Sequence, residues 1–186
     1  MSFKMSEKFD WENMKKYLPA ATVILVAAVL AVVDQVLKGI VMSTMEKGET
    51  VPFIKGFMQW TYTTNNGMSW SLLSGQTIFL VTVSVVALGF MAYVLVKGWI
   101  QHLIGYCAFA MVAGGAMGNL ADRIFNGGHV VDYIDITPWF NFPIFNFADC
   151  CIVVGAIILF IYIWIFHRDL DKKDDEPAVT DNAAED

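Results

Sequence analysis

The chain has 186 residues, 56% of them hydrophobic, and a formal net charge of −6. Its apolar residues gather in long runs instead of being spread as a soluble core requires, which excludes an ordinary soluble globular domain. Residues 169–186 carry eight acidic side chains and two lysines. The net charge therefore arises in this tail and indicates nothing about partners of the remaining chain.

Four apolar runs predict four membrane-spanning helices, because each is near the ~20 residues that a helix needs to cross a bilayer. The runs cover residues 18–33, 78–96, 100–120 and 150–166. The first and last are short, and polar-ended flanking residues can extend them. We therefore expect a cytoplasmic N-terminal segment (1–17), a four-span membrane domain (18–166) and a disordered, acidic cytoplasmic tail (167–186).

The first run has a second interpretation, since Lys15 and Lys16 ahead of it also suit a cleaved signal peptide. The run continues, however, into Asp34, Gln35 and Lys38, which a mature soluble start would not need, and this favours an uncleaved span. Asp34 and Lys38 lie one helical turn apart at the outer end of that span. They can form a solvated ion pair or hold a functional loop in place, and the sequence leaves both open.

The connection between the first two spans, about residues 39–77, predicts a small antiparallel sheet on the outer membrane surface. Residues 57–64 are rich in strand formers, and Asn65-Asn66-Gly67 is a turn signal. Three aromatic residues of this connection suit the headgroup zone of the membrane: Trp60, Tyr62 and Trp70. The alternative to a sheet is a loosely structured loop that these aromatic residues anchor to the membrane.

The second and third spans are joined by only residues 97–99, which predicts a tight antiparallel hairpin of helices. Residues 114–118 are small and predict close helix packing in the third span. The three cysteines lie in or beside apolar runs, and we expect them to act as small hydrophobic residues without a disulfide framework: Cys107, Cys150 and Cys151.

The positions of the basic residues predict the orientation. With the N-terminus inside, one side of the membrane holds Lys4, Lys8, Lys15, Lys16, Lys97, Arg168, Lys172 and Lys173. The other side holds Lys38, Lys47, Lys55 and Arg123. Because basic residues favour the cytoplasmic side, both termini are expected there, and the connection between the third and fourth spans is expected at the outer face.

Two carboxylates beside that connection, Asp132 and Asp149, are the strongest candidates for chemistry. Acidic residues at the edge of hydrocarbon are costly and usually serve chemistry or transport. Residues 126–128 let the chain turn back, so both carboxylates lie near one membrane face and can share one proton. In an aspartic protease the ionised member of such a pair takes a proton from water, and the protonated member donates to the substrate.

Simpler interpretations also exist for the acidic residues. Asn146 is a good N-cap, and Asp149 three residues later suits the helix dipole. Asp135 can be solvated in a loop, and Asp122 can be balanced by Arg123. Capping does not account for Asp132, which lies in a run that otherwise has the character of a buried segment.

Four rival functions remain. A metal site could use His129, Asp132 and Asp135, with or without Cys150, but no second histidine lies nearby. A cysteine, Cys150 or Cys151, could act as a nucleophile with His129 as base, although cysteine at the start of an apolar helix usually packs. A transporter would use the acids as a proton relay, but all lie at one face and none in mid-span. A four-span scaffold would tolerate loss of both carboxylates.

Five motifs in this order resemble the bacterial lipoprotein signal peptidase family (signal peptidase II) over roughly residues 19–166. They are Asp34-Gln35 with Lys38, Asn65-Asn66-Gly67, Gly118-Asn119-Leu120-Ala121-Asp122-Arg123, Val130-Val131-Asp132-Tyr133 and Phe145-Asn146-Phe147-Ala148-Asp149. Two departures affect the substrate-facing turn and hence fine specificity. Tyr133 replaces a commoner Phe, and Met68-Ser69-Trp70 replaces an Ala-Ala-aromatic run.

The resemblance implies an aspartic endopeptidase of the bacterial inner membrane. It would remove the signal peptide from prolipoproteins just before a diacylglyceryl-modified cysteine. Asp132 and Asp149 would be the catalytic dyad. The supporting and substrate-binding residues would be Asn65, Gly67, Asn119, Asp122, Arg123, Asn146, Asp34 and Lys38. The family fold is an all-α bundle of four membrane helices with a small outer β-cradle.

The expected partners are lipidated prolipoproteins and membrane lipid. We expect a monomer without metal, cofactor or nucleic-acid partner. Because Asp149 lies near a helix N-terminus, where the ionised form is favoured, Asp149 is expected to act as the base and Asp132 to carry the proton.

Overall fold

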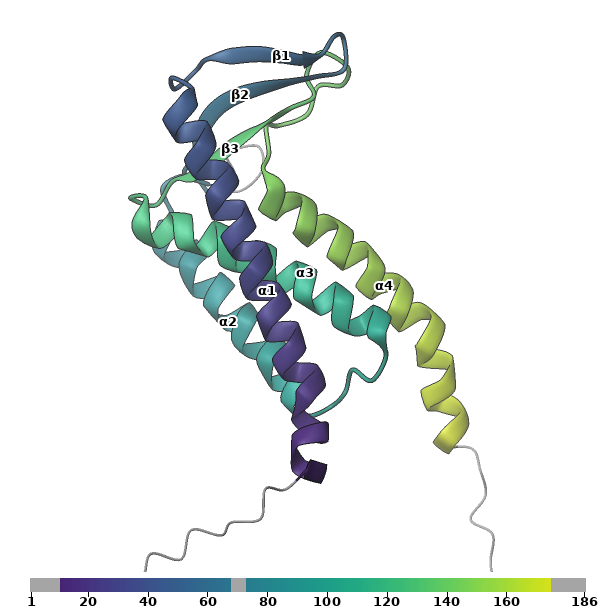
Figure 1. Ribbon diagram of the computed structural model, residues 1–186. Coiled ribbons are helices and arrows are strands. Elements are labelled where there is room, and N and C mark those ends of the chain that lie inside the picture. The colour runs from purple at the N-terminus through teal and green to yellow at the C-terminus, as the bar shows by residue number, and fades with distance from the viewer. Residues whose placement is uncertain (1–10, 68–72, 175–186) are drawn as a thin grey trace, which may run out of the picture.

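The structure is a computed structural model that describes residues 11–67 and 73–174. Its helices and strands, shown in Figure 1, are α1 (Trp11–Thr44), β1 (Thr50–Ile54), β2 (Met58–Asn65), α2 (Thr77–Val96), α3 (Leu103–Phe125), β3 (Val130–Asp135) and α4 (Phe147–Asp174). Residues 1–10, the tail from residue 175 onward and the Met68-Ser69-Trp70 departure lie outside the described residues. Helix α4 nevertheless includes residues 167–174, which the sequence assigns to a disordered tail.

Four helices are long and apolar enough to cross a membrane, as the sequence predicts. Their outward surfaces carry large apolar side chains, and Phe90 and Phe160 are 62% and 72% exposed. Apolar surface on this scale needs lipid around it. The first helix is longer than predicted, because the Asp34–Lys38 pair neutralises its own charge inside the helix and α1 continues to Thr44.

Helix α3 packs between α1 and α4, and glycines allow the close approach. A Cβ at Gly114 would lie 2.7 Å from Leu30 Cβ on α1, and one at Gly155 would lie 2.9 Å from Met111 Cβ on α3. Small residues at such contacts let membrane helices approach backbone to backbone. The predicted small-residue packing in the third span is therefore confirmed.

The three strands form one antiparallel sheet in the order β1-β2-β3. Figure 1 shows the sheet beyond the end of the bundle where α1 ends and α4 begins, away from the start of α1 and the end of α4. The predicted sheet is confirmed with two differences. Its third strand comes from the connection between α3 and α4, and the hairpin turns at Gly56 (φ 75°) instead of at residues 65–67.

A small apolar cluster joins the sheet to the bundle. Val41 near the end of α1 packs with Val131 and Tyr133 of β3, and all three are buried. Pro52 lies on the outer strand β1, where its missing N–H breaks no pairing with a further strand. The cluster fixes β3 directly above the ends of α1 and α3, where the polar residues gather.

Candidate active site

Strand β3 is paired along both edges, and this pairing brings the second acidic segment beside it. On one side it pairs with β2. On the other side Tyr133 N and Ile134 N donate to Phe145 O over 3.0 and 2.7 Å, and Phe145 N donates to Ile134 O over 3.0 Å. The chain after β3 therefore returns to it just before α4. Asn146 is placed next to Asp132 as a result.

Asp132 is buried, with 4% of its surface exposed. Its Oδ1 accepts a 2.7 Å hydrogen bond from Asn146 Nδ2, and the side chain of Asn65 also bonds to it. Burial and the negative charge of Asp149 raise the pKa of Asp132 to about 7, against the opposing effects of these hydrogen bonds and Lys38. Asp132 can therefore hold a proton at neutral pH.

Asp149 lies in the first turn of α4, and the predicted capping interaction is confirmed. Its backbone N–H donates to Asn146 Oδ1 (2.9 Å), and its Oδ2 accepts from the Asn146 N–H (3.3 Å). Its other oxygen, Oδ1, accepts a 2.8 Å bond from Asn119 Nδ2. Capping thus uses only Oδ2 of this carboxylate, so a capping role for Asp149 does not exclude a catalytic one.

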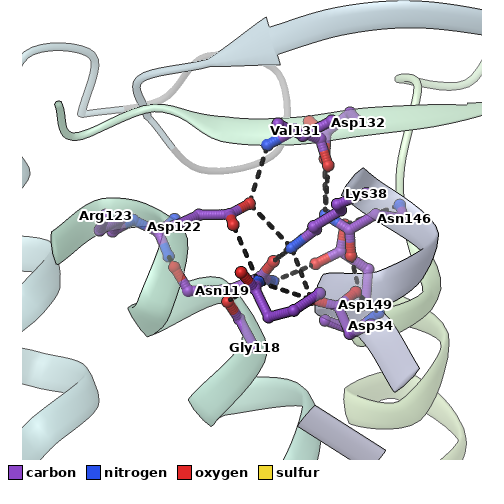
Figure 2. Close-up of polar contacts among 12 residues, drawn as sticks. Asp34, Lys38, Gly118, Asn119, Asp122, Arg123, Val131, Asp132, Asn146 and Asp149 are labelled. Atoms are coloured by element: carbon purple, nitrogen blue, oxygen red, sulfur yellow. Dashed lines mark hydrogen bonds and ion pairs between the residues drawn. The ribbon is translucent and has the colours of Figure 1, made fainter. Parts of the chain in front are cut away.

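Lys38 is the centre of the polar network in Figure 2. Its Nζ lies 2.8 Å from Asp34 Oδ2 and 2.9 Å from Asp122 Oδ2, and it donates to Asn119 Oδ1 over 3.0 Å. The Lys38 and Asp34 side chains are 1% and 0% exposed, so the solvated ion pair considered from the sequence is wrong. Arg123 is a possible balancing charge for Asp122 from the sequence, but the ion pair of Asp122 in the structure is with Lys38.

The carboxylates of Asp34 and Asp122 also hold the chain segments that carry Asp132 and Asp149. Asp34 Oδ1 accepts the Ala148 N–H at the start of α4 (3.0 Å), and Asp122 Oδ2 accepts the Val131 N–H of β3 (3.0 Å). Gln35, a polar residue in an apolar helix, donates from Nε2 to Asp122 Oδ1 over 2.9 Å. Gln35 is not among the site residues predicted from the sequence, although its polarity in the span is a usable signal.

Arg123 connects the end of β2 to α3. Its guanidinium donates to Gly67 O (3.2 Å) and Asn119 O (3.4 Å), while the Gly67 N–H donates to Asn65 Oδ1 (2.9 Å). Its Nε is buried without a hydrogen-bond partner within the described residues. The structure thus places all ten predicted residues around one network: Asp34, Lys38, Asn65, Gly67, Asn119, Asp122, Arg123, Asp132, Asn146 and Asp149.

The metal site considered from the sequence does not form among the described residues. His129 is exposed, with its Nδ1 against Gly127 O, and Asp135 points away from Asp132 to the other face of β3. Across the described residues, no three histidine, cysteine or acidic side chains gather as a metal site. Asp135 is also not solvated, because it is only 3% exposed and accepts hydrogen bonds from three residues.

A cavity of about 360 Å³ opens beside the two aspartates. Its polar lining includes Asp132, Asp149 and Arg123. The rest is mostly apolar and comes from α2, α4 and the segment before α4: Phe79, Leu80, Val83, Ile144, Ile152 and Val153. These apolar residues could not be predicted from the sequence, because they do not differ from the lipid-facing residues around them.

A sequence profile of the family described as signal peptidase (SPase) II matches residues 26–165 of the chain. The chain belongs to this family. It is 39% identical to a lipoprotein signal peptidase of Enterococcus faecalis (75% of this chain, 85% of that protein) and 36% identical to one of Staphylococcus aureus (87% and 98%). Membership makes the chain a membrane protease that cleaves signal peptides.

Two solved structures share the fold of this family member. Both are described as bacterial membrane enzyme structures. One superposes with a TM-score of 0.74 at 33% identity, over 80% of this chain and 91% of the other. The second has a TM-score of 0.69 at 35% identity, over 77% and 92%. The predicted architecture of four membrane helices with a small antiparallel sheet is confirmed.

Proposed function

We propose that this signal peptidase II family member is an aspartic endopeptidase that removes signal peptides from diacylglyceryl-modified prolipoproteins, cutting just before the lipidated cysteine. The observation that carries the proposal is the pair of carboxylates at one cavity, one of which has a pKa near 7. The substrate class is supported by the relatives, which are named lipoprotein signal peptidases.

In the proposed mechanism the dyad holds one proton. Asp149 is the ionised member, since it caps α4 and accepts the Asn119 and Asn146 hydrogen bonds. It takes a proton from a water as that water attacks the scissile carbonyl. Asp132 donates its proton to the developing oxyanion. As the tetrahedral intermediate collapses and the C–N bond breaks, Asp149 passes the proton that it took from water to the leaving amine, and Asp132 takes back a hydroxyl proton as the new carboxyl group forms.

The cavity suits a substrate that is itself inserted in the membrane. Its apolar wall lies between α2 and α4, and Phe79, Val83 and Val153 are about half exposed at its rim. A signal peptide or an acyl chain can therefore reach the carboxylates from the lipid side. We place the sheet and dyad at the outer face of the bacterial inner membrane and both termini in the cytoplasm, on the distribution of basic residues. We also propose that the enzyme acts as a monomer.

A cleavage assay tests this function. The purified wild type should cut a diacylglyceryl-modified prolipoprotein in detergent, seen as a gel shift, with and without EDTA. Asp132→Asn and Asp149→Asn should each lower the rate at least about 10³-fold, because each removes one half of the proton transfer. The same prolipoprotein without its diacylglyceryl group is the substrate control.

The outcomes separate the rival functions. Loss of cleavage with EDTA alone would mean that a metal does the chemistry. Full activity in both aspartate variants would exclude Asp132 and Asp149 as the catalytic dyad. A wild type that leaves a confirmed lipidated substrate intact would exclude this activity and favour transport.

The pH dependence of cleavage gives a second test. Activity needs the proton on Asp132, so kcat/KM should fall as the pH rises above about 7, with the loss of one proton. The charges that face Asp132 are those of Asp149, Lys38 and Arg123. Initial rates between pH 5 and 9 measure this alkaline fall in kcat/KM. A constant kcat/KM up to pH 9 would contradict the role of Asp132 as the proton donor.

A further inference from the structure

Asp135 is a buried carboxylate that the mechanism does not use. Its Oδ2 accepts hydrogen bonds from Gln59 Nε2 and Thr61 Oγ1, each 2.7 Å long. Its Oδ1 accepts from the Thr137 N–H (2.9 Å) and hydroxyl (2.6 Å). Burial works against its charge, but the hydrogen bonds from Thr137, Gln59 and Thr61 outweigh burial and hold the pKa of Asp135 below its ordinary value. The group is therefore an ionised clamp between β2 and β3.

A bulge separates this clamp from the catalytic strand positions. The cross-strand partners are Gln59 with Asp135, Trp60 with Ile134, Thr63 with Asp132 and Asn65 with Val130. Two residues of β2, Thr61 and Tyr62, thus lie opposite the single residue Tyr133. Such a bulge puts one extra residue into a strand and changes which side chains share a face beyond it. Thr61, the first bulged residue, is one of the two β2 residues that Asp135 holds.

The bulge determines where Asn65 points. Cross-strand partners share a face, so Asn65 lies on the same face as Asp132 and its side chain bonds to that carboxylate. Without the extra residue, the partner of Asn65 would be His129, on the opposite face, and Tyr62 would lie opposite Asp132. A slip of one residue in register turns every later side chain of β2 over.

We propose that Asp135 is a positioning residue for the dyad: by holding Gln59 and Thr61 it keeps the bulge in place and so keeps Asn65 and Asp132 on one face. This role rests on the proposed aspartic protease function. Asp135 itself lies on the other face of β3 and acts only through the register of the sheet. Its effect reaches the chemistry because Asp132 is three residues away on the same strand.

The test compares three variants of the full-length enzyme. Asp135→Ala removes the clamp and should lower kcat roughly 10- to 100-fold, since small misplacements of catalytic groups have effects of this size. KM should change less than about 3-fold, because the apolar cavity wall is untouched. Thr61→Val removes one clamp bond and should lower kcat less. Thr61 Oγ1 also lies 3.1 Å from Thr50 Oγ1, so Thr50→Val, which breaks only that contact, is the matched control and should leave kcat unchanged.

An infrared titration of the Asp132 carboxyl distinguishes positioning from a loss of folding. The signal is obtained by subtracting the spectrum of the Asp132→Asn variant in each background. Without the clamp, Asp132 becomes hydrated and its pKa should fall toward the ordinary value, moving the alkaline limb of kcat/KM to lower pH. The proposal would be overturned if kcat of Asp135→Ala fell only in proportion to the folded fraction and the titration of Asp132 did not change.

The design also separates this inference from the proposed function. If the wild type does not cleave lipidated prolipoprotein, the protease assignment fails, while the titration still tests whether Asp135 controls the environment of Asp132. If Asp135→Ala does not fold, the comparison of Thr61→Val with Thr50→Val tests whether the clamp positions the dyad. Equal kcat and equal Asp132 titration in those two variants would overturn the proposal.

Discussion

Asp132→Asn should abolish cleavage and at the same time stabilise the folded protein above pH 7. The loss of activity follows from removing the proton donor and should be at least about 10³-fold. The gain in stability follows from the cost of burying a charge. Asparagine keeps the size of the side chain, and its Oδ1 can still accept the hydrogen bond from Asn146 Nδ2. The buried charge is lost, and the side chain of Asn65, which bonds to Asp132, meets an amide in place of a carboxylate.

The sign of the stability effect comes from the raised pKa of Asp132, about 7 in the folded protein against the ordinary 3.8. Between these values the unfolded chain has lost the proton and the folded protein has kept it, so stability falls as the pH rises from about 4 to 7. The full difference corresponds to about 4 kcal/mol above pH 7 and to less at pH 5. The asparagine variant has no such loss.

Thermal unfolding in detergent at pH 5 and pH 8 measures this prediction. The gain in Tm of Asp132→Asn over the wild type should be larger at pH 8. Asp135→Asn on the same strand is the matched control, because its expected change in Tm at pH 8 has the opposite sign. The pKa of Asp135 is lowered, so its charge adds stability above pH 4, and neutralising it should lower Tm at pH 8. A Tm for Asp132→Asn below that of the wild type at pH 8 would show that the charge of Asp132 is well paired.

The spans and the place of the two aspartates at the ends of apolar segments could be predicted from the sequence, because both signals are local. Long apolar runs are sufficient to identify helices that cross a membrane, and acidic residues at the ends of such runs are conspicuous. The capping interaction between Asn146 and Asp149 is also local, since the two residues are three positions apart. Strand β3 could not be predicted in this way, because Asp132 and Asp135 interrupt its apolar pattern, and their partners lie on other segments.

The partners of the buried charges could not be predicted for the same reason. The i,i+4 spacing of Asp34 and Lys38 is compatible with both a solvated and a buried pair. The choice depends on α3, which brings Asp122 within 2.9 Å of Lys38 Nζ and covers the pair. Gly118 on α3 makes this possible, because a Cβ there would lie 2.5 Å from Asp34 Oδ2. Packing between distant segments, which periodicity does not reveal, therefore determines the network.

Lys38→Met should destabilise the protein and remove its activity together. The methionine matches the length of the lysine stem but leaves Asp34 and Asp122 buried, with no cation between them. Removing one partner of a buried ion pair typically costs about 3–5 kcal/mol, because the remaining charge is unpaired. For a chain of this size the loss corresponds to a fall in Tm of roughly 10 °C. Lys47→Met, at an exposed lysine in the turn between α1 and β1, is the control and should change neither quantity.

Activity should be lost beyond what the lower stability explains, because Lys38 also holds the residues that carry the dyad. Its bond to Asn119 Oδ1 orients the amide that donates to Asp149, and its pairs with Asp34 and Asp122 hold the carboxylates that bind the Ala148 and Val131 N–H groups. Rates should therefore be compared per folded molecule at a temperature well below the Tm of the variant. A folded Lys38→Met enzyme with the wild-type kcat would show that Lys38 only stabilises the bundle.

A double variant separates the two effects of Lys38. In Lys38→Met with Asp34→Asn, one of the two uncompensated charges is absent, so part of the lost Tm should return. The asparagine Oδ1 can still accept the Ala148 N–H, which preserves the start of α4. Cleavage should stay low, because Asn119 still lacks the cation that orients it toward Asp149. Recovery of Tm without recovery of kcat would show that the buried lysine orders the dyad as well as neutralising the charges around it.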